Sequence, residues 1–261
     1  MVPLPLRSRR RGGALNEISA ATVLRALSLV RDGRVRDLAH VLHADVPAFP
    51  GRTFRQYLTT NYHQINRRHP AAGPSGLGRN NVNWIVEQIT ATQQMGTHMD
   101  GLNHLQVGDR TYNGYALSDI IEDHGTNRLG SDTLPQIVTR GLLVDIAGAR
   151  GVVHLQPGDV ITVAETRAAL EADGLSVRPG DAVFFYTGWG QLWDADNQTY
   201  AAGEPGPGVD LGDWLAAQRT ALTGCDTWSY GAYPPEDPGC PSSFRRSSTS
   251  ATGSWSSRTC G

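Results

Sequence analysis

Cysteine, long apolar runs and an excess of one sign of charge are all scarce in this 261-residue sequence. Its three cysteines form no CxxC pair and show no zinc-ribbon spacing, which argues against a disulfide scaffold and fits a reducing cytoplasm. No apolar run is long enough to span a bilayer. The net charge is −2 and both signs are mixed along most of the chain, so neither a nucleic-acid nor a membrane partner is expected.

Several catalytic signatures are also missing. The sequence contains no G-x-S-x-G nucleophile elbow, no P-loop and no dinucleotide-binding fingerprint. What is present is a hydrophobic share of 39%, sufficient for a core, together with 30 Gly and 15 Pro that imply many turns. This length suits one large α/β domain, or one domain with extensions.

The two ends differ in composition from the middle. Four arginines between residues 7 and 11 precede a stretch that is not apolar, so residues 1–12 are interpreted as a disordered basic leader rather than a signal peptide. Residues 240–261 contain eight Ser and three Thr but no Asp, Glu or Lys, and are interpreted as a tail that does not fold. We expect the folded domain to cover residues 13–239.

The tail has a second interpretation, a frameshift. Codons compatible with residues 240–261, read one nucleotide earlier, permit an apolar, strand-like string that ends in Glu-Asn. The DNA around the codon for Cys240 would decide between this frameshift hypothesis and a natural disordered tail.

Helical periodicity and capping residues predict three helices. Ser19 caps the first, which should run to about Arg31 with Val23, Leu24, Leu27 and Val30 on one face and Gly33 after its end. The second follows the capping-box pair Thr162 and Glu165 and ends near Gly174; the third begins at Asp210 and ends near Gly224.

Strands are predicted between these helices, so the fold class is α/β. A half-buried strand is expected where apolar and polar residues alternate, and buried strands where apolar residues are continuous. These segments are 35–42 (strand or strand plus turn), 83–90 (half-buried), 142–146, 160–161 and 182–186, with a long loop over 64–82.

One short segment carries the candidate chemistry. His98 and Asp100 are two positions apart, Gln94 precedes His98 by four and His104 follows it by six. Residues i and i+2 on an extended backbone point the same way, so His98 and Asp100 could face one ion. An imidazole and a carboxylate suit Zn²⁺, Mn²⁺ or Fe²⁺, and a Gln94 amide oxygen would favour harder ions such as Mn²⁺.

Such an ion would lower the pKa of a bound water, and His104 would serve as the nearby general acid or base. From spacing alone this stays suggestive. Two histidines and an aspartate also occur together by chance, and a histidine among polar neighbours is most often a hydrogen-bonded surface residue.

The same segment resembles the motif HxGTHxDxPxH of the cyclase family, which includes bacterial kynurenine formamidases and isatin hydrolases. This chain has QxGTHxDxLxH: Gly96, Thr97, His98, Asp100 and His104 match. Gln94 stands where the first metal-binding His is usual, which leaves the identity and affinity of the metal open, and Leu102 replaces the usual Pro. Further similar landmarks run in family order, at 13–16, 46–50, 112–115, 179–181, 187–189 and 224–227.

The resemblance implies a swivelling β/β/α fold, a small-molecule substrate and assembly into homo-oligomers. It makes His98 and Asp100 ligands of a divalent metal, Mn or Zn, with Gln94 the third ligand and His104 the acid/base residue. Family members mostly hydrolyse amide or lactone bonds, and we expect an arylformamidase-type reaction, as in tryptophan catabolism. Two alternatives are a lactone or dienelactone hydrolase on this scaffold, and an inactive product, because the usual C-terminal strand ending in Glu-Asn is missing.

Three further residues have two interpretations each. Trp84 and Trp189 are candidate walls of an aromatic substrate pocket, although a packing role is at least as plausible for both. Asp226 is either a carboxylate that orients a histidine or, as the safer expectation, a capping or turn residue.

Overall fold

The computed structural model describes residues 13–61, 79–80 and 82–236. It divides into two compact units. The sheet unit comprises residues 1–37 and 99–261, and the hairpin unit comprises residues 38–98. The predicted leader, the predicted tail with its frameshift hypothesis, and most of the predicted 64–82 loop lie outside the described residues.

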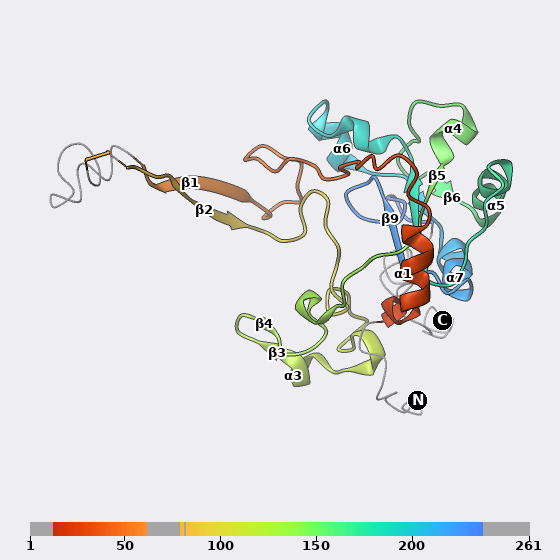
Figure 1. Cartoon of the computed structure of the whole chain (residues 1–261), viewed down its shortest axis with the longest axis horizontal. Coiled ribbons are helices and arrows are strands. Elements are labelled where there is room, and N and C mark those ends of the chain that lie inside the picture. Colours follow the sequence, from red (N-terminus) through yellow and green to blue (C-terminus); the bar gives the residue numbers. More distant parts are fainter. Residues whose placement is uncertain (1–12, 62–78, 81, 237–261) are drawn as a thin grey trace. The chain divides into compact units, whose positions relative to one another are not determined.

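Three parallel strands form the main sheet of the sheet unit (Figure 1). They are β5 (Gly141–Asp145), β7 (Ala182–Tyr186) and β9 (Leu222–Cys225), in the order β5-β7-β9. Val183 of β7 lies opposite Leu142 on one side and Thr223 on the other. Helices connect these strands, as parallel pairing requires, so the predicted α/β class is confirmed.

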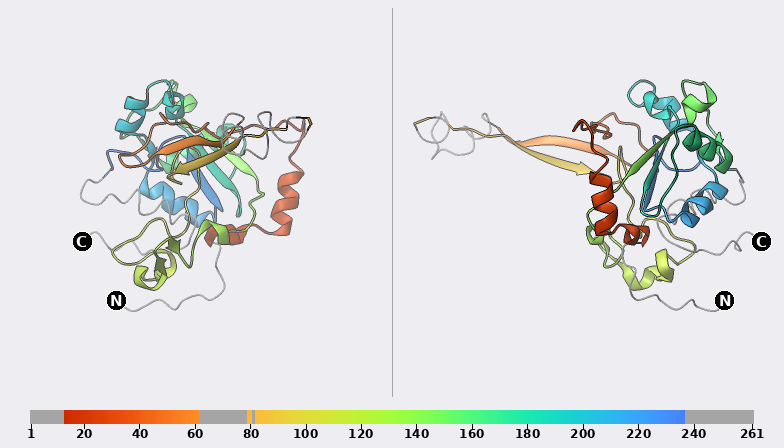
Figure 2. Two further views of the ribbon diagram at one scale, coloured as in Figure 1. Left: turned by 90° about the vertical axis from the view of Figure 1, so that its left-hand side faces the viewer. Right: turned by 45° about the vertical axis from the view of Figure 1, so that its right-hand side comes forward.

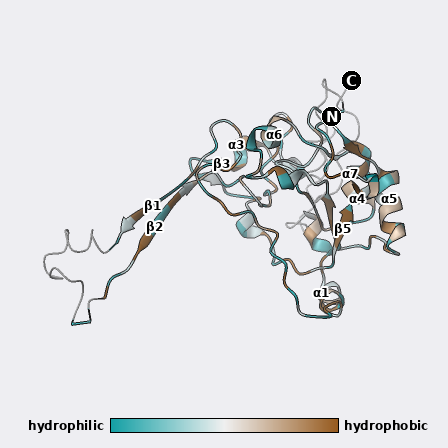
Figure 3. Ribbon diagram, turned by 90° about the horizontal axis from the view of Figure 1, so that it is seen from above, coloured by the Kyte–Doolittle hydropathy of each residue, from teal (hydrophilic) through white to brown (hydrophobic). Residues whose placement is uncertain are grey.

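Helices α4 (Ile146–Arg150), α5 (Val163–Ala172) and α7 (Val209–Ala217) gather beside this sheet and supply its core (Figure 2). The core is made of buried apolar side chains from both layers: Leu142, Val144, Ile146, Ala147, Leu155, Ile161, Leu170, Val183, Phe185, Leu211 and Leu215. Burial of each of the larger side chains, all except Ala147, stabilises the fold by about 1.5–3 kcal/mol. Strand β5, strongly hydrophobic in Figure 3, alternates: Leu142 and Val144 are buried while Leu143 is 63% exposed.

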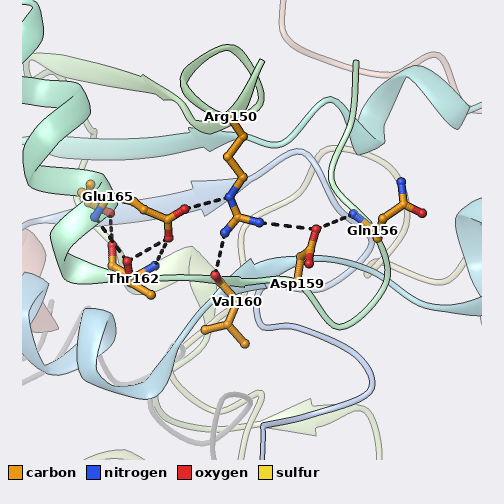
Figure 4. Close-up of polar contacts among 7 residues, drawn as sticks. Arg150, Gln156, Asp159, Val160, Thr162 and Glu165 are labelled. Atoms are coloured by element: carbon orange, nitrogen blue, oxygen red, sulfur yellow. Dashed lines mark hydrogen bonds and ion pairs between the residues drawn. The ribbon is translucent and has the colours of Figure 1, made fainter. Parts of the chain in front are cut away.

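One arginine ties the end of α4 to the start of α5 (Figure 4). The Arg150 Nε donates to Glu165 Oε1 at 2.7 Å and its Nη2 donates to the carbonyl of Val160 at 2.9 Å, while Nη1 lies 3.4 Å from Asp159 Oδ2. Glu165 also completes a capping box with Thr162. The Arg150 and Thr162 hydrogen bonds lower the pKa of Glu165 although partial burial acts in the opposite direction and is the largest single effect. The network fixes where α5 begins.

The other elements of the sheet unit are short. They are η1 (Gly13–Glu17), α1 (Ala20–Leu27), η3 (Tyr112–Gly114), α3 (Leu117–Ile120), β3 (Ile121–Glu122), β4 (Gly125–Thr126), η4 (Ser131–Thr133), β6 (Val160–Ile161), η5 (Trp189–Leu192), α6 (Asn197–Ala202) and β8 (Gly206–Pro207). Strand β3 pairs with β4 antiparallel and β6 with β8 parallel. No helix in the described part of the chain combines the length and apolar character needed to cross a bilayer.

The hairpin unit is built around one antiparallel pair, β1 (Phe54–Thr60) and β2 (Val86–Ala91). Phe54 pairs with Ala91 and Leu58 with Glu87, and the register shifts between Leu58 and Thr60. Phe54 is buried, but every residue of β2 is exposed.

Several sequence expectations are corrected by these elements. The first helix keeps its Ser19 cap but ends at Leu27, and its apolar side chains Leu24, Leu27 and Val30 are exposed rather than packed. No strand forms within 35–42, and the strand predicted over 83–90 begins only at Val86 and is exposed instead of half-buried.

The helix predicted from Asp210 to Gly224 was wrong at both ends. Gly208 is the N-cap of α7 and Asp210 lies inside the first turn. The helix stops at Ala217, and Leu222 to Gly224 belong to β9. Pairing with β7 converts this apolar stretch into a strand, a tertiary effect that local periodicity does not contain. The strands at 142–146 and 182–186 and the capping box are confirmed, apart from Ile146, which begins α4. The expected full burial of the first strand is wrong, because Leu143 and the two ends of β5 are exposed.

Candidate functional site

In the hairpin unit, the segment carrying Gln94 and His98 is anchored by backbone contacts. Arg52 Nη1 donates to the Gln94 carbonyl at 2.9 Å, and Met95 is buried. The Thr97 hydroxyl donates to the Leu38 carbonyl at 3.0 Å and accepts from the His40 N–H at 3.1 Å. The segment is therefore held on both sides of Gly96, whose φ of 58° suits glycine.

The His98 imidazole has a defined tautomer. Its Nδ1 lies 2.8 Å from the carbonyl oxygen of Gly96, which can only accept, so Nδ1 carries the proton. In the neutral ring the lone pair is then on Nε2. A backbone carbonyl that orients a histidine in this way is the common arrangement behind metal-ligating imidazoles.

In the sheet unit, Asp100 and His104 lie close together. Asp100 Oδ2 is 3.8 Å from His104 Nε2, and the two side chains are 37% and 28% exposed. The turn between them is closed by a hydrogen bond from the His104 N–H to the Gly101 carbonyl at 3.0 Å. A Cβ on Gly101 would lie 2.5 Å from Asn103 Oδ1, so a larger residue there would require the Asn103 side chain to move.

The predicted site residues therefore fall into two pairs. The division between the units follows His98, which leaves Gln94 with His98 in one unit and Asp100 with His104 in the other. The described residues contain no group of three or more His, Cys, Asp or Glu that could hold a metal ion. The predicted ligand set contains only two such residues, because its third member is the amide of Gln94. Oxygen from Asp100 and Gln94 and nitrogen from His98 are donor types that fit Mn²⁺ or Zn²⁺.

The two candidate substrate-binding tryptophans have different surroundings. Trp84 is 42% exposed. Trp189 is fully buried, donates from Nε1 to the Tyr200 carbonyl at 3.2 Å and packs edge-on against His154 with ring centroids 5.7 Å apart. These contacts match the packing alternative for Trp189, and a substrate-binding role for either residue stays a prediction.

Asp226 joins the loops that follow β7 and β9. Its Oδ1 accepts from the Thr187 N–H at 2.8 Å and the Thr187 hydroxyl at 2.5 Å, and its Oδ2 accepts from the Gly190 N–H at 3.3 Å. These bonds join residues 36 and 39 positions apart, so Asp226 connects two loops, and neither of its expected roles is tested by them. Ligand sites in open α/β sheets lie outside the carboxyl ends of the strands, so Asp226 shapes the edge where such a site would form.

One buried acidic residue, Glu204, is not predicted from the sequence. Glu204 is 0% exposed, and its carboxyl group accepts from the Ser229 N–H at 2.9 Å and the Ser229 hydroxyl. Burial raises its pKa to about 8, and hydrogen bonds from residues 227–229 only partly offset this. The residue lies in a Gly- and Pro-rich stretch that looks like a solvated loop, so nothing in the local sequence indicates its burial.

Solved structures share this fold. A structure described as a novel cyclase is 25% identical, with a TM-score of 0.76 over 86% of this chain and 76% of that one. Isatin hydrolase A from Labrenzia aggregata, bound to benzyl benzoate, is 21% identical with a TM-score of 0.55, covering 84% of this chain and 78% of that one. Isatin hydrolase A from Ralstonia solanacearum is 20% identical with a TM-score of 0.56, covering 88% and 81%.

The sequence itself matches a family model over most of its length. No curated protein is significantly similar to the chain. Residues 36–232, however, match the Cyclase model described as "Putative cyclase", a range that includes Gln94, His98, Asp100 and His104. This chain belongs to the cyclase family.

Proposed function

We propose that the protein is a metal-dependent hydrolase that cleaves an amide bond in a small molecule, with an arylformamidase-type reaction as the specific activity. The observation that carries the proposal is the contact between Asp100 and His104, 3.8 Å apart, directly after the Gly96-Thr97-His98 segment. An acid/base histidine beside a carboxylate, with a second histidine of defined tautomer two positions before that carboxylate in the chain, suits the chemistry of hydrolysis.

The residues have separate roles in this proposal. Gln94, His98 and Asp100 hold a divalent ion, Mn²⁺ or Zn²⁺, through one nitrogen and two oxygens. Such an ion, when bound, supplies Lewis acidity that polarises a carbonyl and acidifies water. His104, whose Nε2 lies beside the Asp100 carboxylate, takes a proton from the attacking water and gives it to the departing amine.

The substrate class is inferred from the structural neighbours. Two of them are described as isatin hydrolases, and isatin is a cyclic amide fused to an aromatic ring. We therefore favour aryl amides and lactams, with a lactone as the alternative on the same scaffold. We also propose that the enzyme works in the cytoplasm as a homo-oligomer, without nucleic-acid or membrane partners.

Metal content and turnover together test the proposal. The purified protein, loaded with Mn²⁺ or Zn²⁺ and desalted, should retain about one ion per chain by mass spectrometry and hydrolyse an N-formyl anilide or isatin faster than an aryl lactone. His98→Ala and Asp100→Ala should lose both the ion and activity. His124→Ala is the matched control, because its side chain is 87% exposed and lies on the β3–β4 turn.

The opposite results are equally informative. If wild-type protein retains neither ion, or if both variants bind it as wild type does, the metal site is refuted. Faster turnover of the lactone would favour the alternative function, lactone hydrolysis. A folded, metal-loaded protein without turnover on any of the three substrates would favour the inactive product.

A further inference from the structure

Two side chains hold the backbone on either side of His104. The Thr111 hydroxyl donates to the carbonyls of Leu102 at 3.0 Å and Leu105 at 3.2 Å. The Gln106 Nε2 donates to the carbonyls of Asn103 at 2.9 Å and His104 at 3.0 Å. All four successive carbonyls from 102 to 105 therefore have a side-chain donor. The single hydroxyl proton is shared in a three-centre bond, while the amide has a proton for each acceptor.

A tight reversal of the chain brings Thr111 back to this segment. Val107 and Arg110 exchange backbone hydrogen bonds at 2.7 and 3.2 Å, with Gly108 at φ 62° between them. Thr111, next in the chain, is 0% exposed. Because it is buried, the Thr111 hydroxyl cannot hydrogen-bond to water in place of these carbonyls. Removing it would leave both carbonyls without this donor.

The backbone of Thr111 is fixed as well. Its N–H donates to the Tyr115 carbonyl at 3.0 Å and its carbonyl accepts from the Gly114 N–H at 3.0 Å. The turn that makes these bonds contains two left-handed residues, Asn113 at φ 61° and Gly114 at φ 77°. Asn and Gly tolerate this region best, so the Tyr112–Tyr115 segment has the sequence needed to hold Thr111 in place.

We propose that Thr111 and Gln106 are positioning residues for His104. They act through the backbone: by fixing the carbonyls of 102–105 they keep the imidazole Nε2 beside the Asp100 carboxylate, at the observed 3.8 Å. The inference rests on the proposed acid/base role of His104. A small misplacement of such a group has a large effect on rate, of order a hundredfold for about 1 Å.

The experiment compares Thr111→Val, Thr111→Ser and Gln106→Ala with wild type in kcat, KM and the His104 ring signal by NMR of the zinc-loaded protein. Thr111→Val removes the hydroxyl at nearly constant volume, and Thr111→Ser restores it. The matched control is Thr166→Val on α5, because Thr166 is also 0% exposed and its hydroxyl donates to a backbone carbonyl, that of Thr162, at 2.9 Å.

We expect Thr111→Val to lower kcat by about tenfold or more with KM changed less than about twofold, and to shift the His104 ring signal. Thr111→Ser should stay within about twofold of wild type, and Gln106→Ala should fall between the two. Thr166→Val should lower thermal stability while leaving kcat and the His104 signal unchanged. Gln106 is exposed, so Gln106→Ala carries the same test if Thr111→Val does not fold.

Two results would overturn the inference. One is a folded Thr111→Val, or Gln106→Ala, with wild-type kcat and an unshifted His104 signal. The other is a Thr166→Val variant that loses as much kcat as Thr111→Val, which would make the effect one of general stability. If wild-type protein hydrolyses none of the substrates, the proposed function fails, but the NMR comparison still decides whether these two residues position His104.

Discussion

Glu204 should make the free energy of unfolding decrease as the pH rises from acidic to neutral values. Its carboxyl group is fully buried, and its pKa rises from an ordinary 4.5 to about 8 because burial disfavours the charged form. Between these two values the folded state holds a proton that the unfolded state has released. The stabilising contribution is thus complete below pH 4.5 and is lost as the pH rises towards 8.

The magnitude follows from proton linkage. One proton of difference between folded and unfolded states changes the free energy of unfolding by about 1.4 kcal/mol per pH unit, so the loss between pH 5.5 and 7.5 is about 2.5 kcal/mol. Glu165 and Asp196 have lowered pKa values. Their contributions therefore change only at more acidic pH and do not mask this window.

Urea unfolding followed by circular dichroism at pH 5.5, 6.5, 7.5 and 8.5 measures the effect. Wild-type protein should become less stable across this series, with a flatter response above pH 8. Glu204→Gln removes the titrating group and should flatten the whole series, whatever its absolute stability. Glu171→Gln, an exposed glutamate on α5, removes a carboxyl at the surface and should leave the wild-type slope. A Glu204→Gln variant with the wild-type slope would refute the reasoning.

The remaining predictions concern the free energy of unfolding, measured by urea titration. Asp181→Ala leaves Arg140, whose side chain is 12% exposed, without its buried partner and should cost about 3–5 kcal/mol, whereas Asp32→Ala in an exposed pair should cost under about 1 kcal/mol. Equal costs would contradict the buried pair. Thr162→Ala removes the capping box of α5 and should cost about 1 kcal/mol. Leu215→Ala, at a fully buried position, should cost about 2–5 kcal/mol, and a smaller value would place it outside the core.

The sequence predicts correctly the features that depend on interactions between residues close together in the chain. The Thr162 and Glu165 capping box and the Ser19 cap involve residues three positions apart, so the sequence alone predicts them. Continuous apolar runs identified β5 and β7 as strands, but only β7 is covered on both sides as such a run suggests, because Leu143 of β5 is exposed. The order β5-β7-β9 and the conversion of 222–225 from helix to strand depend on pairing partners far along the chain, and no local pattern contains them.

The candidate site shows the same limit. The structure places Asp100 beside His104 within the segment that the spacing indicated, while the metal-binding and acid/base roles stay predictions. The spacing gave no sign that Thr111 and Gln106 hold that segment, since these are common residues whose importance comes from a chain reversal at Gly108. The burial of Glu204 was equally hidden, because it arises from the return of residues 227–229 after β9.

The hydrogen bonds of Asp226 have a consequence for redesign of this protein. A carboxylate in one loop is the acceptor for two backbone N–H groups and a hydroxyl in another, so the two loops are interdependent. Transplanting the Thr187–Gly190 segment from a relative would leave the half-buried carboxyl group of Asp226 without these donors unless the residue at 226 were exchanged with it. Changes at this sheet edge should therefore be made as paired substitutions, one in each loop, because a change in one loop alone removes hydrogen bonds from the other.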